Sequence, residues 1–154
     1  MDKAPLVSSL NAELRHRYDR AISALTGARE AATGADTKAE NKYDTRGLEA
    51  SYLAAGQAEQ ADELFRALHA VETFEFADFE LDAPIALGAL VETEQEDEIH
   101  HYLLAPAGGG IVLETDQGEP VTVLGPASPL ARKLIGQVAG SILRDPEILI
   151  LEVF

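Results

Sequence analysis

Two long helical repeats of hydrophobic residues occupy the first half of this sequence, and no other feature restricts the possible folds so strongly. Between residues 14 and 32, apolar residues follow one another at spacings of 4, 3, 4, 3 and 4. A similar stripe runs from residue 48 to residue 68. Such spacing is typical of a helix packed lengthwise against a partner. The two stripes consist of Leu14, Tyr18, Ala21, Leu25, Ala28 and Ala32, and of Leu48, Tyr52, Ala55, Ala58, Ala61, Phe65 and Leu68.

The segment between the stripes breaks the helix and restarts it. Gly34 can take the left-handed conformation that ends a helix. Thr37, with Glu40 three residues later, has the pattern of a capping box. We therefore expect residues 1–79 to form an antiparallel coiled-coil hairpin with an acidic tip near residues 34–47.

The remaining sequence changes from a helical to a strand-like period and predicts an α+β domain over residues 80–154. An acidic, aromatic stretch from residue 72 to residue 82 is expected to link the two domains and to dock through its phenylalanines. Acidic residues 92–98 and the Gly-rich run 106–110 are expected as turns. The predicted strands are residues 85–92, 99–105, 111–114, 121–124 and 148–153.

One short helix is expected among these strands. Ser128 is a good N-cap, Pro129 suits the first helical position, and Gly136 suits the C-terminal stop. Leu130, Leu134 and Ile135 are predicted to form the buried stripe of this helix. A short helix across a small antiparallel sheet completes the α+β class.

Composition and charge exclude several functions. The 154 residues include no cysteine, which removes disulfides and thiol chemistry, and 46% are hydrophobic. Residues 1–9 look like a loose leader without the pattern of a signal peptide, and no apolar run has the roughly 20 residues of a membrane span. We therefore expect a cytoplasmic monomer. The net charge of −15 argues against stable direct DNA binding, which normally requires a basic face.

The outer face of the first predicted helix carries Arg15, Arg17, Arg20 and Arg29. Two interpretations are open for this face. It is either an ordinary solvated helix surface or a patch that contacts RNA or an acidic partner.

Residues 121–137, Val-Thr-Val-Leu-Gly-Pro-Ala-Ser-Pro-Leu-Ala-Arg-Lys-Leu-Ile-Gly-Gln, resemble the C-terminal domain of the bacterial GreA/GreB transcript-cleavage factors. In that family a strand and a Ser-Pro-(Leu/Ile) helix ending in glycine recur in an FKBP-like fold. Residues 49–55, Glu-Ala-Ser-Tyr-Leu-Ala-Ala, are similar to the start of the family's second helix. The order of parts, a hairpin followed by an FKBP-like domain, also agrees over nearly the whole chain.

The resemblance implies a function. The C-terminal domain would bind RNA polymerase at its secondary channel, here through Ser128, Pro129, Leu130, Arg132 and Lys133. The hairpin would enter the channel toward the RNA 3′ end. Acidic residues at its tip would help to hold a catalytic Mg²⁺, so that the polymerase cleaves its own backtracked transcript. The protein itself would then not be an enzyme and would hold no cofactor of its own.

The tip differs from the family's pattern, in which an acidic pair precedes the tyrosine of the second helix. Aligning through Tyr52 places Thr45 and Ser51 at the two acidic positions. Aligning through Glu40 instead keeps an acid in register but requires additional residues before Tyr52. The candidate tip carboxylates are Asp36, Glu40, Asp44 and Glu49, with Glu40, Asp44 and Glu49 assigned to catalysis and Glu40 and Asp44 to the shared Mg²⁺.

Glu40 and Asp44 also have a purely structural interpretation, which is helix capping and surface pairing with Lys42 or Arg46. The altered tip therefore leaves a second hypothesis open, a Gre-fold polymerase modulator or inhibitor without cleavage activity. A third hypothesis makes the FKBP-like domain a prolyl isomerase. The few aromatic residues of the predicted sheet disfavour it. Adjacent His100 and His101 should point to opposite faces of a strand and are not expected to share a metal.

Overall fold

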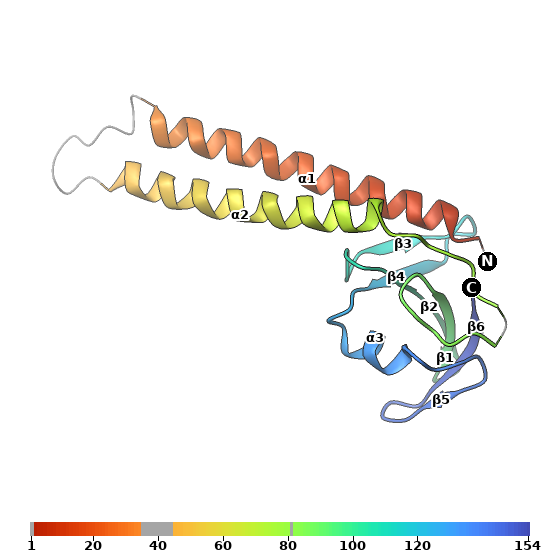
Figure 1. Cartoon of the computed structure of the whole chain (residues 1–154). Helices are drawn as coiled ribbons and strands as arrows, with labels where there is room; N and C mark the ends of the chain where they lie inside the picture. Colours follow the sequence, from red (N-terminus) through yellow and green to blue (C-terminus); the bar gives the residue numbers. More distant parts are fainter. Residues whose placement is uncertain (1, 35–44, 81) are drawn as a thin grey trace. The chain divides into compact units, whose positions relative to one another are not determined.

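Two long helices and a six-stranded sheet make up the chain in a computed structural model (Figure 1). The structure describes residues 2–34, 45–80 and 82–154. Residues 13–68 form one unit, which we call the hairpin unit, and residues 1–12 with 69–154 form a second, the sheet unit. This arrangement confirms the predicted fold class, a helical hairpin followed by an α+β sheet with one short helix.

In the hairpin unit, helices α1 (Ala4–Thr33) and α2 (Arg46–Glu72) run antiparallel and side by side (Figure 1). The predicted stripe of α1 is confirmed, because its six members are all buried or half-buried. Ala21 and Leu25 of α1 pack against Ala61 of α2, with Ala58 and Leu64 beside them. Burial of this apolar seam stabilises the pair far more than helix propensity alone would.

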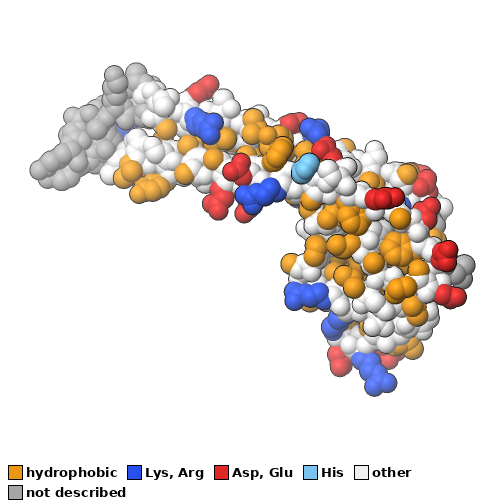
Figure 2. All heavy atoms as spheres, in the orientation of Figure 1, with side chains coloured by type: hydrophobic (Ala, Val, Ile, Leu, Met, Phe, Trp, Pro, Cys, Tyr) orange, Lys and Arg blue, Asp and Glu red, His pale blue; other side chains and the backbone are white. Residues whose placement is uncertain are grey.

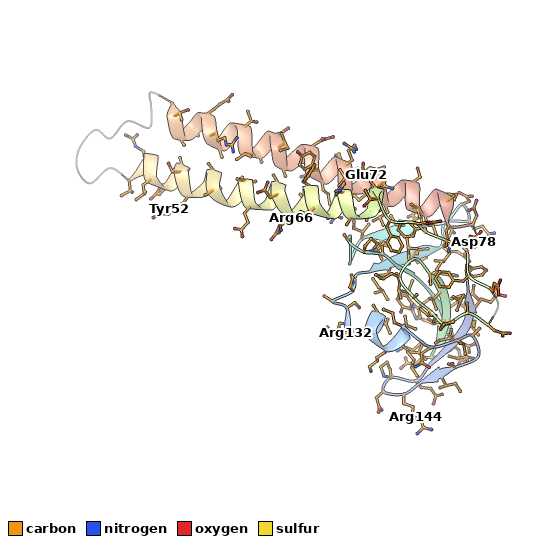
Figure 3. All side chains as sticks on the ribbon, in the orientation of Figure 1. Tyr52, Arg66, Glu72, Asp78, Arg132 and Arg144 are labelled. Atoms are coloured by element: carbon orange, nitrogen blue, oxygen red, sulfur yellow. The ribbon has the colours of Figure 1, made fainter. Side chains whose placement is uncertain are left out.

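The predicted stripe of α2 was wrong in several positions. Leu48, Tyr52 and Phe65 are 56%, 70% and 54% exposed, and Ala55 is exposed too. Tyr52 points away from α1 (Figure 3). Ala58 of the predicted stripe does pack beside Ala21 and Ala61, and the ring of Phe65, although exposed, lies with its centroid 5.9 Å from that of Tyr18. A row of buried and half-buried residues on α2 repeats at spacings of 3, 4, 3, 4, 3 and 4, and its members are Gly47, Ala50, Ala54, Gln57, Ala61, Leu64 and Leu68. Most of them are small, which lets the helices approach closely.

The expected loose leader over residues 1–9 is also wrong, because α1 begins at Ala4. The Oδ1 atom of Asp2 accepts a hydrogen bond of 2.9 Å from the backbone N–H of Ala4, which caps the first turn. Leu6 and Leu10 are 2% and 0% exposed. Burial of these two leucines in the sheet unit therefore extends the helix over a segment that the sequence alone suggested was irregular.

The sheet unit is built on strands in the order β3-β4-β2-β1-β6-β5. All neighbours are antiparallel except β2 and β4, which run parallel, so the sheet is mixed rather than wholly antiparallel. The strands are β1 (Leu90–Gln95), β2 (Glu98–Leu104), β3 (Val112–Glu114), β4 (Pro120–Leu124), β5 (Ile142–Leu143) and β6 (Ile148–Val153).

Two strand predictions need correction. The strand expected at residues 85–92 lies at 90–95, so most of the acidic segment 92–98 is strand rather than turn. Acidic residues have low strand propensity, and the segment was therefore predicted as a turn. Pairing of β1 with β2 on one side and β6 on the other outweighs this low propensity. The two-residue strand β5 was not predicted.

Helix α3 (Pro129–Leu134) covers one face of the sheet. Ala131 and Leu134 of α3 are both fully buried, and they pack with Val91, Leu104 and Ile150 from three strands. The predicted docking of the linker is confirmed by Phe79, which packs against this core. The rings of Phe74 and Phe76 meet edge-on within the linker, with centroids 4.9 Å apart, and Phe74 lies beside Gly88. Among the described residues, no helix combines the length and apolar content needed to cross a bilayer.

Candidate functional site

The helix that the sequence analysis singled out, α3, has the predicted local structure. Ser128 is the N-cap, and its Oγ atom accepts a hydrogen bond of 3.4 Å from the backbone N–H of Ala131. Pro129 occupies the first turn, where a missing N–H costs nothing. Gly136 follows the helix at φ +84°, a left-handed conformation that glycine adopts without strain.

The buried side of α3 differs in part from the prediction. Leu130 is half-buried against the core and Leu134 is fully buried, as expected. Ile135, however, is 42% exposed, so its assignment to the buried stripe was wrong. The helix ends at Leu134, and the chain turns at Ile135 and Gly136 before another helical turn can carry Ile135 inward. Ala131 takes the inward position instead.

The two cations of α3 are exposed, and each is held by a backbone carbonyl. The Nη2 atom of Arg132 donates to the carbonyl of Ala127 at 2.6 Å. The Nζ atom of Lys133 donates to the carbonyl of Asp145, also at 2.6 Å. These contacts shorten the reach of both side chains and keep their charges beside α3 and the β5–β6 turn.

Exposed apolar side chains accompany these cations. Ile135, Val138 and Ile142 are 42%, 39% and 59% exposed, although large aliphatic residues are usually buried. Arg144 follows β5 and extends from the same end of the sheet unit (Figure 3). We call this set the α3 surface, and its members are Arg132, Lys133, Ile135, Val138, Ile142 and Arg144.

The charge distribution of the sheet unit makes the α3 surface distinctive. This unit contains seventeen Asp and Glu residues against four Lys and Arg. Lys3 is buried, so the three exposed cations are all members of the α3 surface. Figure 2 shows these Lys and Arg side chains at the end that carries α3 and β5, next to hydrophobic ones. Exposed apolar side chains together with arginine and other polar groups are typical of protein-binding surfaces.

At the tip, only Glu49 among the candidate catalytic residues is described; Asp36, Glu40 and Asp44 lie outside the described residues, as does the predicted capping box. Glu49 is exposed in the first turn of α2, where a negative charge is favoured by the helix dipole. The hydroxyl of Thr45 donates to Glu49 Oε1 at 3.1 Å. Glu49 therefore presents a carboxylate that has one local donor and remains open to solvent.

The arginine face of α1 is exposed, as expected. The Nε atom of Arg17 lies 2.7 Å from Glu13 Oε1, and this hydrogen bond, with the nearby positive charges, lowers the pKa of Glu13. Arg17 and Arg20 also line a hollow of about 400 Å³ together with Gln57, Gln60 and Leu64 of α2. Both interpretations of this face, solvated surface and binding patch, remain predictions.

Sequence reasoning missed half of the α3 surface. Val138, Ile142 and Arg144 follow α3 in a segment whose only signal was apolar residues without helical or strand period. The two histidines lie as expected on opposite faces of β2: the ring of His100 stacks near Tyr102, whereas His101 is buried and contacts Glu92. Among the described residues, no group of three or more His, Cys, Asp and Glu could hold a metal ion.

Fold and surface thus define a protein that combines a helical hairpin with a small sheet unit, and one side of this unit exposes both cations and apolar side chains. No family model and no curated protein matches the chain. Among solved structures, it is similar to GreA factor homolog 1 (Gfh1) of Thermus thermophilus, with 18% identity, a TM-score of 0.37 and 94% of each chain covered. It is also similar to Thermus aquaticus Gfh1, with 16% identity, a TM-score of 0.35, and 95% of this chain and 92% of that one covered.

A further structure of the transcription factor Gfh1 is 21% identical, with a TM-score of 0.37, and covers 93% of this chain. Such identities and TM-scores do not transfer a function. The function proposed below therefore depends on the residues of this chain.

Proposed function

We propose that this protein is a Gre-like transcription elongation factor that binds RNA polymerase at the secondary channel and stimulates cleavage of backtracked transcripts. The observation that supports this proposal most is the α3 surface. Its members Arg132, Lys133 and Ile135 lie within residues 121–137, the segment with the most specific resemblance to the Gre family. The α3 surface also carries every exposed cation of the sheet unit. Under this proposal the protein acts in the cytoplasm, where the polymerase acts.

The α3 surface suits a partner that is apolar in its centre and acidic at its edge, such as one face of a coiled coil. Ile135, Val138 and Ile142 would supply the desolvated centre of the contact. Arg132 and Lys133 would meet acidic side chains at the rim, where charge governs the association rate and the choice of partner. Ser128, Pro129 and Leu130 contribute by fixing the start of α3 rather than by offering large exposed groups.

The hairpin would supply carboxylates to the polymerase. Glu49, with Glu40 and Asp44 as the other candidates, provides oxygen ligands of the kind that Mg²⁺ takes from one or two carboxylates while it keeps several waters. A Mg²⁺ ion held jointly with the polymerase would activate water for hydrolysis of the RNA phosphodiester. The protein adds charge and position, and the polymerase cleaves the bond. It is therefore not an enzyme on its own in this proposal.

The alternative, a polymerase modulator without cleavage activity, is favoured by one specific observation. In the alignment through Tyr52, the two acidic positions are taken by Thr45 and Ser51, which have neutral side chains. In the structure their hydroxyls are used locally, since Thr45 donates to Glu49 and Ser51 donates to the carbonyl of Gly47 at 2.9 Å. If neither Glu40 nor Asp44 reaches the metal, binding would persist without cleavage.

The test is a transcript-cleavage assay with a stalled, backtracked polymerase, with and without the protein. We expect cleavage to be stimulated by the native chain. Glu40→Gln, Asp44→Asn and Glu49→Gln keep shape but remove the charge that Mg²⁺ requires, so at least one of them should reduce cleavage by about tenfold or more while binding to polymerase is retained.

Glu59→Gln, on an exposed position of α2 away from the tip, is the matched control and should leave cleavage unchanged. Native protein that binds the polymerase but never stimulates cleavage would reject the factor and support the modulator. Native protein that does not bind would reject both.

The prolyl isomerase hypothesis receives no support from the space beneath α3. Eleven buried residues fill the core between α3 and the sheet, with Phe79, Leu130 and Tyr102 packed against it. A substrate proline would have to displace these close-packed side chains. An isomerisation assay on a model peptide is expected to show no acceleration.

A further inference from the structure

The outer edge of strand β6 is only partly covered by its neighbour β5. Strand β6 has six residues, whereas β5 has two, which pair with the first two residues of β6. One residue further, Ile150 donates to the carbonyl of Ser141 at 2.9 Å and accepts from the N–H of Gly140 at 2.8 Å. Among the described strands, none pairs with residues 151–153 on this side. We call residues 151–153 the open edge.

The backbone of Val153 supplies a donor and an acceptor at the open edge. The next residue, Phe154, exchanges two hydrogen bonds with Leu90, at 2.8 and 3.0 Å. Successive residues of an antiparallel strand direct their N–H and C=O groups to opposite sides, so both groups of Val153 point away from β1. Outside the strand ladders, no described residue pairs with either group. Such an unpaired edge is where another extended chain can add to a sheet.

A hollow of about 450 Å³ lies along the open edge, and this volume is within the range of ligand-binding pockets. Residues 151–154 form one side of the hollow. Asp78 (Figure 3) and Phe79 of the linker, together with Ala139, form the rest of its lining. We call this hollow the edge groove.

The linker side of the edge groove is held in place by two contacts. Lys3 Nζ donates to the carbonyl of Ala77 in the linker and to the carbonyl of Phe154 after β6, which joins the two segments. Phe79 packs against the core beneath α3. The described residues of the linker form no backbone hydrogen bond with the open edge. The groove is therefore preformed, which lowers the entropy cost of binding a ligand.

The lining of the edge groove restricts the ligand. It is apolar except for two carboxylates, Asp78 and Glu152, which are both exposed. Residues 72–82 around Asp78 contain four further acidic residues and no basic one. An apolar side chain with a lysine or arginine beside it matches this lining in polarity and in charge. A second copy of the chain is a poor match, because its net charge of −15 is repelled here.

We propose that the edge groove binds an extended segment of a basic partner protein, which adds to β6 as a short strand. The backbone of the segment pairs with the N–H and C=O of Val153. One apolar side chain fills the groove, and a lysine or arginine beside it meets Asp78 or Glu152. At roughly 3.4 Å per residue the open edge is about 10 Å long, so the paired stretch is short. The proposed action on RNA polymerase is not required for this binding.

The first probe is a short blocked peptide in which an arginine at each end flanks a Val-Ile-Val core. It is titrated into the full-length protein by calorimetry. We expect saturable binding with a Kd of about 100 μM, since the contact is small. Amide hydrogen exchange followed by NMR should show Val153 exchanging at least about tenfold more slowly in the complex. The Phe154 amide, which already donates to Leu90, should not change.

N-methylation of the peptide separates strand addition from simple apolar attraction. Alternate N–H groups of an added strand face β6, and the others face solvent. Methylating one core residue should therefore weaken binding by about tenfold or more, whereas methylating its neighbour should weaken it by less than about threefold.

Glu152→Lys tests the charge of the groove and should weaken peptide binding by at least about fivefold. Glu152 is in register with Glu92, so lysine there replaces a like-charge pair with an opposite pair and should not harm folding. Glu147→Lys is the matched control, because it makes the same charge change at an exposed residue outside the groove. It should leave the affinity within about twofold.

Three outcomes would overturn the proposal. The first is absence of saturable binding up to about 1 mM peptide. The second is equal weakening by Glu152→Lys and Glu147→Lys, which would show general attraction between a basic peptide and an acidic protein. The third is an unchanged exchange rate of the Val153 amide together with equal effects of methylation at neighbouring positions, which would show that no strand is added.

Discussion

At the scale of single residues, Lys3 is the most unusual side chain of the sheet unit. It is a lysine with 5% exposure, although charged residues are almost never fully buried without partners. Its Nζ atom donates to the carbonyls of Ala77, Gly88 and Phe154 at 2.5, 3.2 and 3.0 Å. It also lies 4.9 Å from the centre of the Phe79 ring. One ammonium group therefore joins the first turn of α1 to the linker, to the loop before β1 and to the end of β6.

Replacing Lys3 with methionine should lower the free energy of unfolding by about 1–3 kcal/mol, because three carbonyls lose their charged donor. Lys133→Met is the matched control, since that lysine is exposed and bonds one carbonyl, and it should change stability by less than about 0.5 kcal/mol. Urea denaturation measures both. Equal losses in the two variants would show that the three contacts of Lys3 add nothing.

The pH dependence of unfolding gives a second readout for Lys3. Burial lowers the pKa of Lys3, and the negative charge of Asp78 opposes this shift in part. The folded state therefore gives up the Lys3 proton at a lower pH than the unfolded chain does. Between the two pKa values the unfolded state binds more protons, so stability should rise with pH in that window. Lys3→Met should remove this rise.

Gly88 illustrates a different constraint on a single residue. It has φ +95°, and a Cβ atom added there would lie 3.0 Å from Cε1 of Phe74, whose ring is held by Phe76. Gly88→Ala should therefore destabilise by more than Gly118→Ala, which has a similar φ of +81° but open space around it.

We expect backbone strain to lower the free energy of unfolding by about 1–2 kcal/mol in both variants. The contact with Phe74 should lower it by about 1–3 kcal/mol more in Gly88→Ala. Thermal unfolding compares the two variants directly. A Phe74→Ala background should abolish the difference between them, and a difference that persists there would assign it to another cause.

At the scale of elements, the sequence predicted every helix and strand except β5, but it did not predict which side of α2 faces inward. The α1 stripe was found correctly because large residues such as Leu14 and Leu25 mark it. On α2 the large residues Leu48, Tyr52 and Phe65 are exposed, whereas most of the residues that face α1 are small, with Leu64 and Leu68 as the large ones. Where two helices lie close together, there is little room for large side chains between them. Small residues then fill much of the contact, and the size of a hydrophobic residue no longer predicts its burial.

The corrected register makes a testable distinction between two alanines of α2. Ala61 is 3% exposed and packs against Ala21 and Leu25, whereas Ala55 is exposed. Ala61→Leu should overpack the seam and cost about 1–3 kcal/mol. Ala55→Leu should change stability by less than about 0.5 kcal/mol. Thermal unfolding followed by circular dichroism measures the stability of both variants. A larger loss of stability for Ala55→Leu than for Ala61→Leu would show that Ala55 lies on the packed side of α2.

Helix α3 shows how far local sequence rules reach. Its capping residue Ser128, its first residue and its glycine stop all obey strong local preferences, so its bounds were predictable. Which side of it is buried depends on where the chain turns after Leu134, and that is set by tertiary contacts. The backbone N–H of Gly136, for example, donates to the carbonyl of Ile85 at 2.8 Å, far away in sequence. The exposed Ile135 was unpredictable for this reason.

At the scale of the whole molecule, the dominant property is the excess of acid, with a net charge of −15. In the sheet unit the exposed exceptions are the cations of the α3 surface. A partner that is itself acidic would be repelled by most of this unit and attracted only there. Charge therefore orients the approach as well as strengthening the contact.

Reversing charge at Arg132 and Lys133 should weaken binding to RNA polymerase by about tenfold or more, and the loss should be greater at low salt. Arg15→Glu/Arg66→Glu makes the same charge change on the hairpin unit and should have a smaller effect. A pull-down or surface binding assay with both double variants measures the difference. Unchanged affinity of the Arg132 variant would place the contact elsewhere on the molecule.

The two outermost strands of the sheet have a consequence for the behaviour of the protein at high concentration. β3 has three residues and β5 has two, and these lie at opposite edges of the sheet. An open edge can pair with the edge of another molecule only along the length of its unbonded backbone, and short edge strands offer very little of it. Because mutual repulsion between acidic copies acts in the same direction, such copies are poorly suited to template one another into extended β-aggregates.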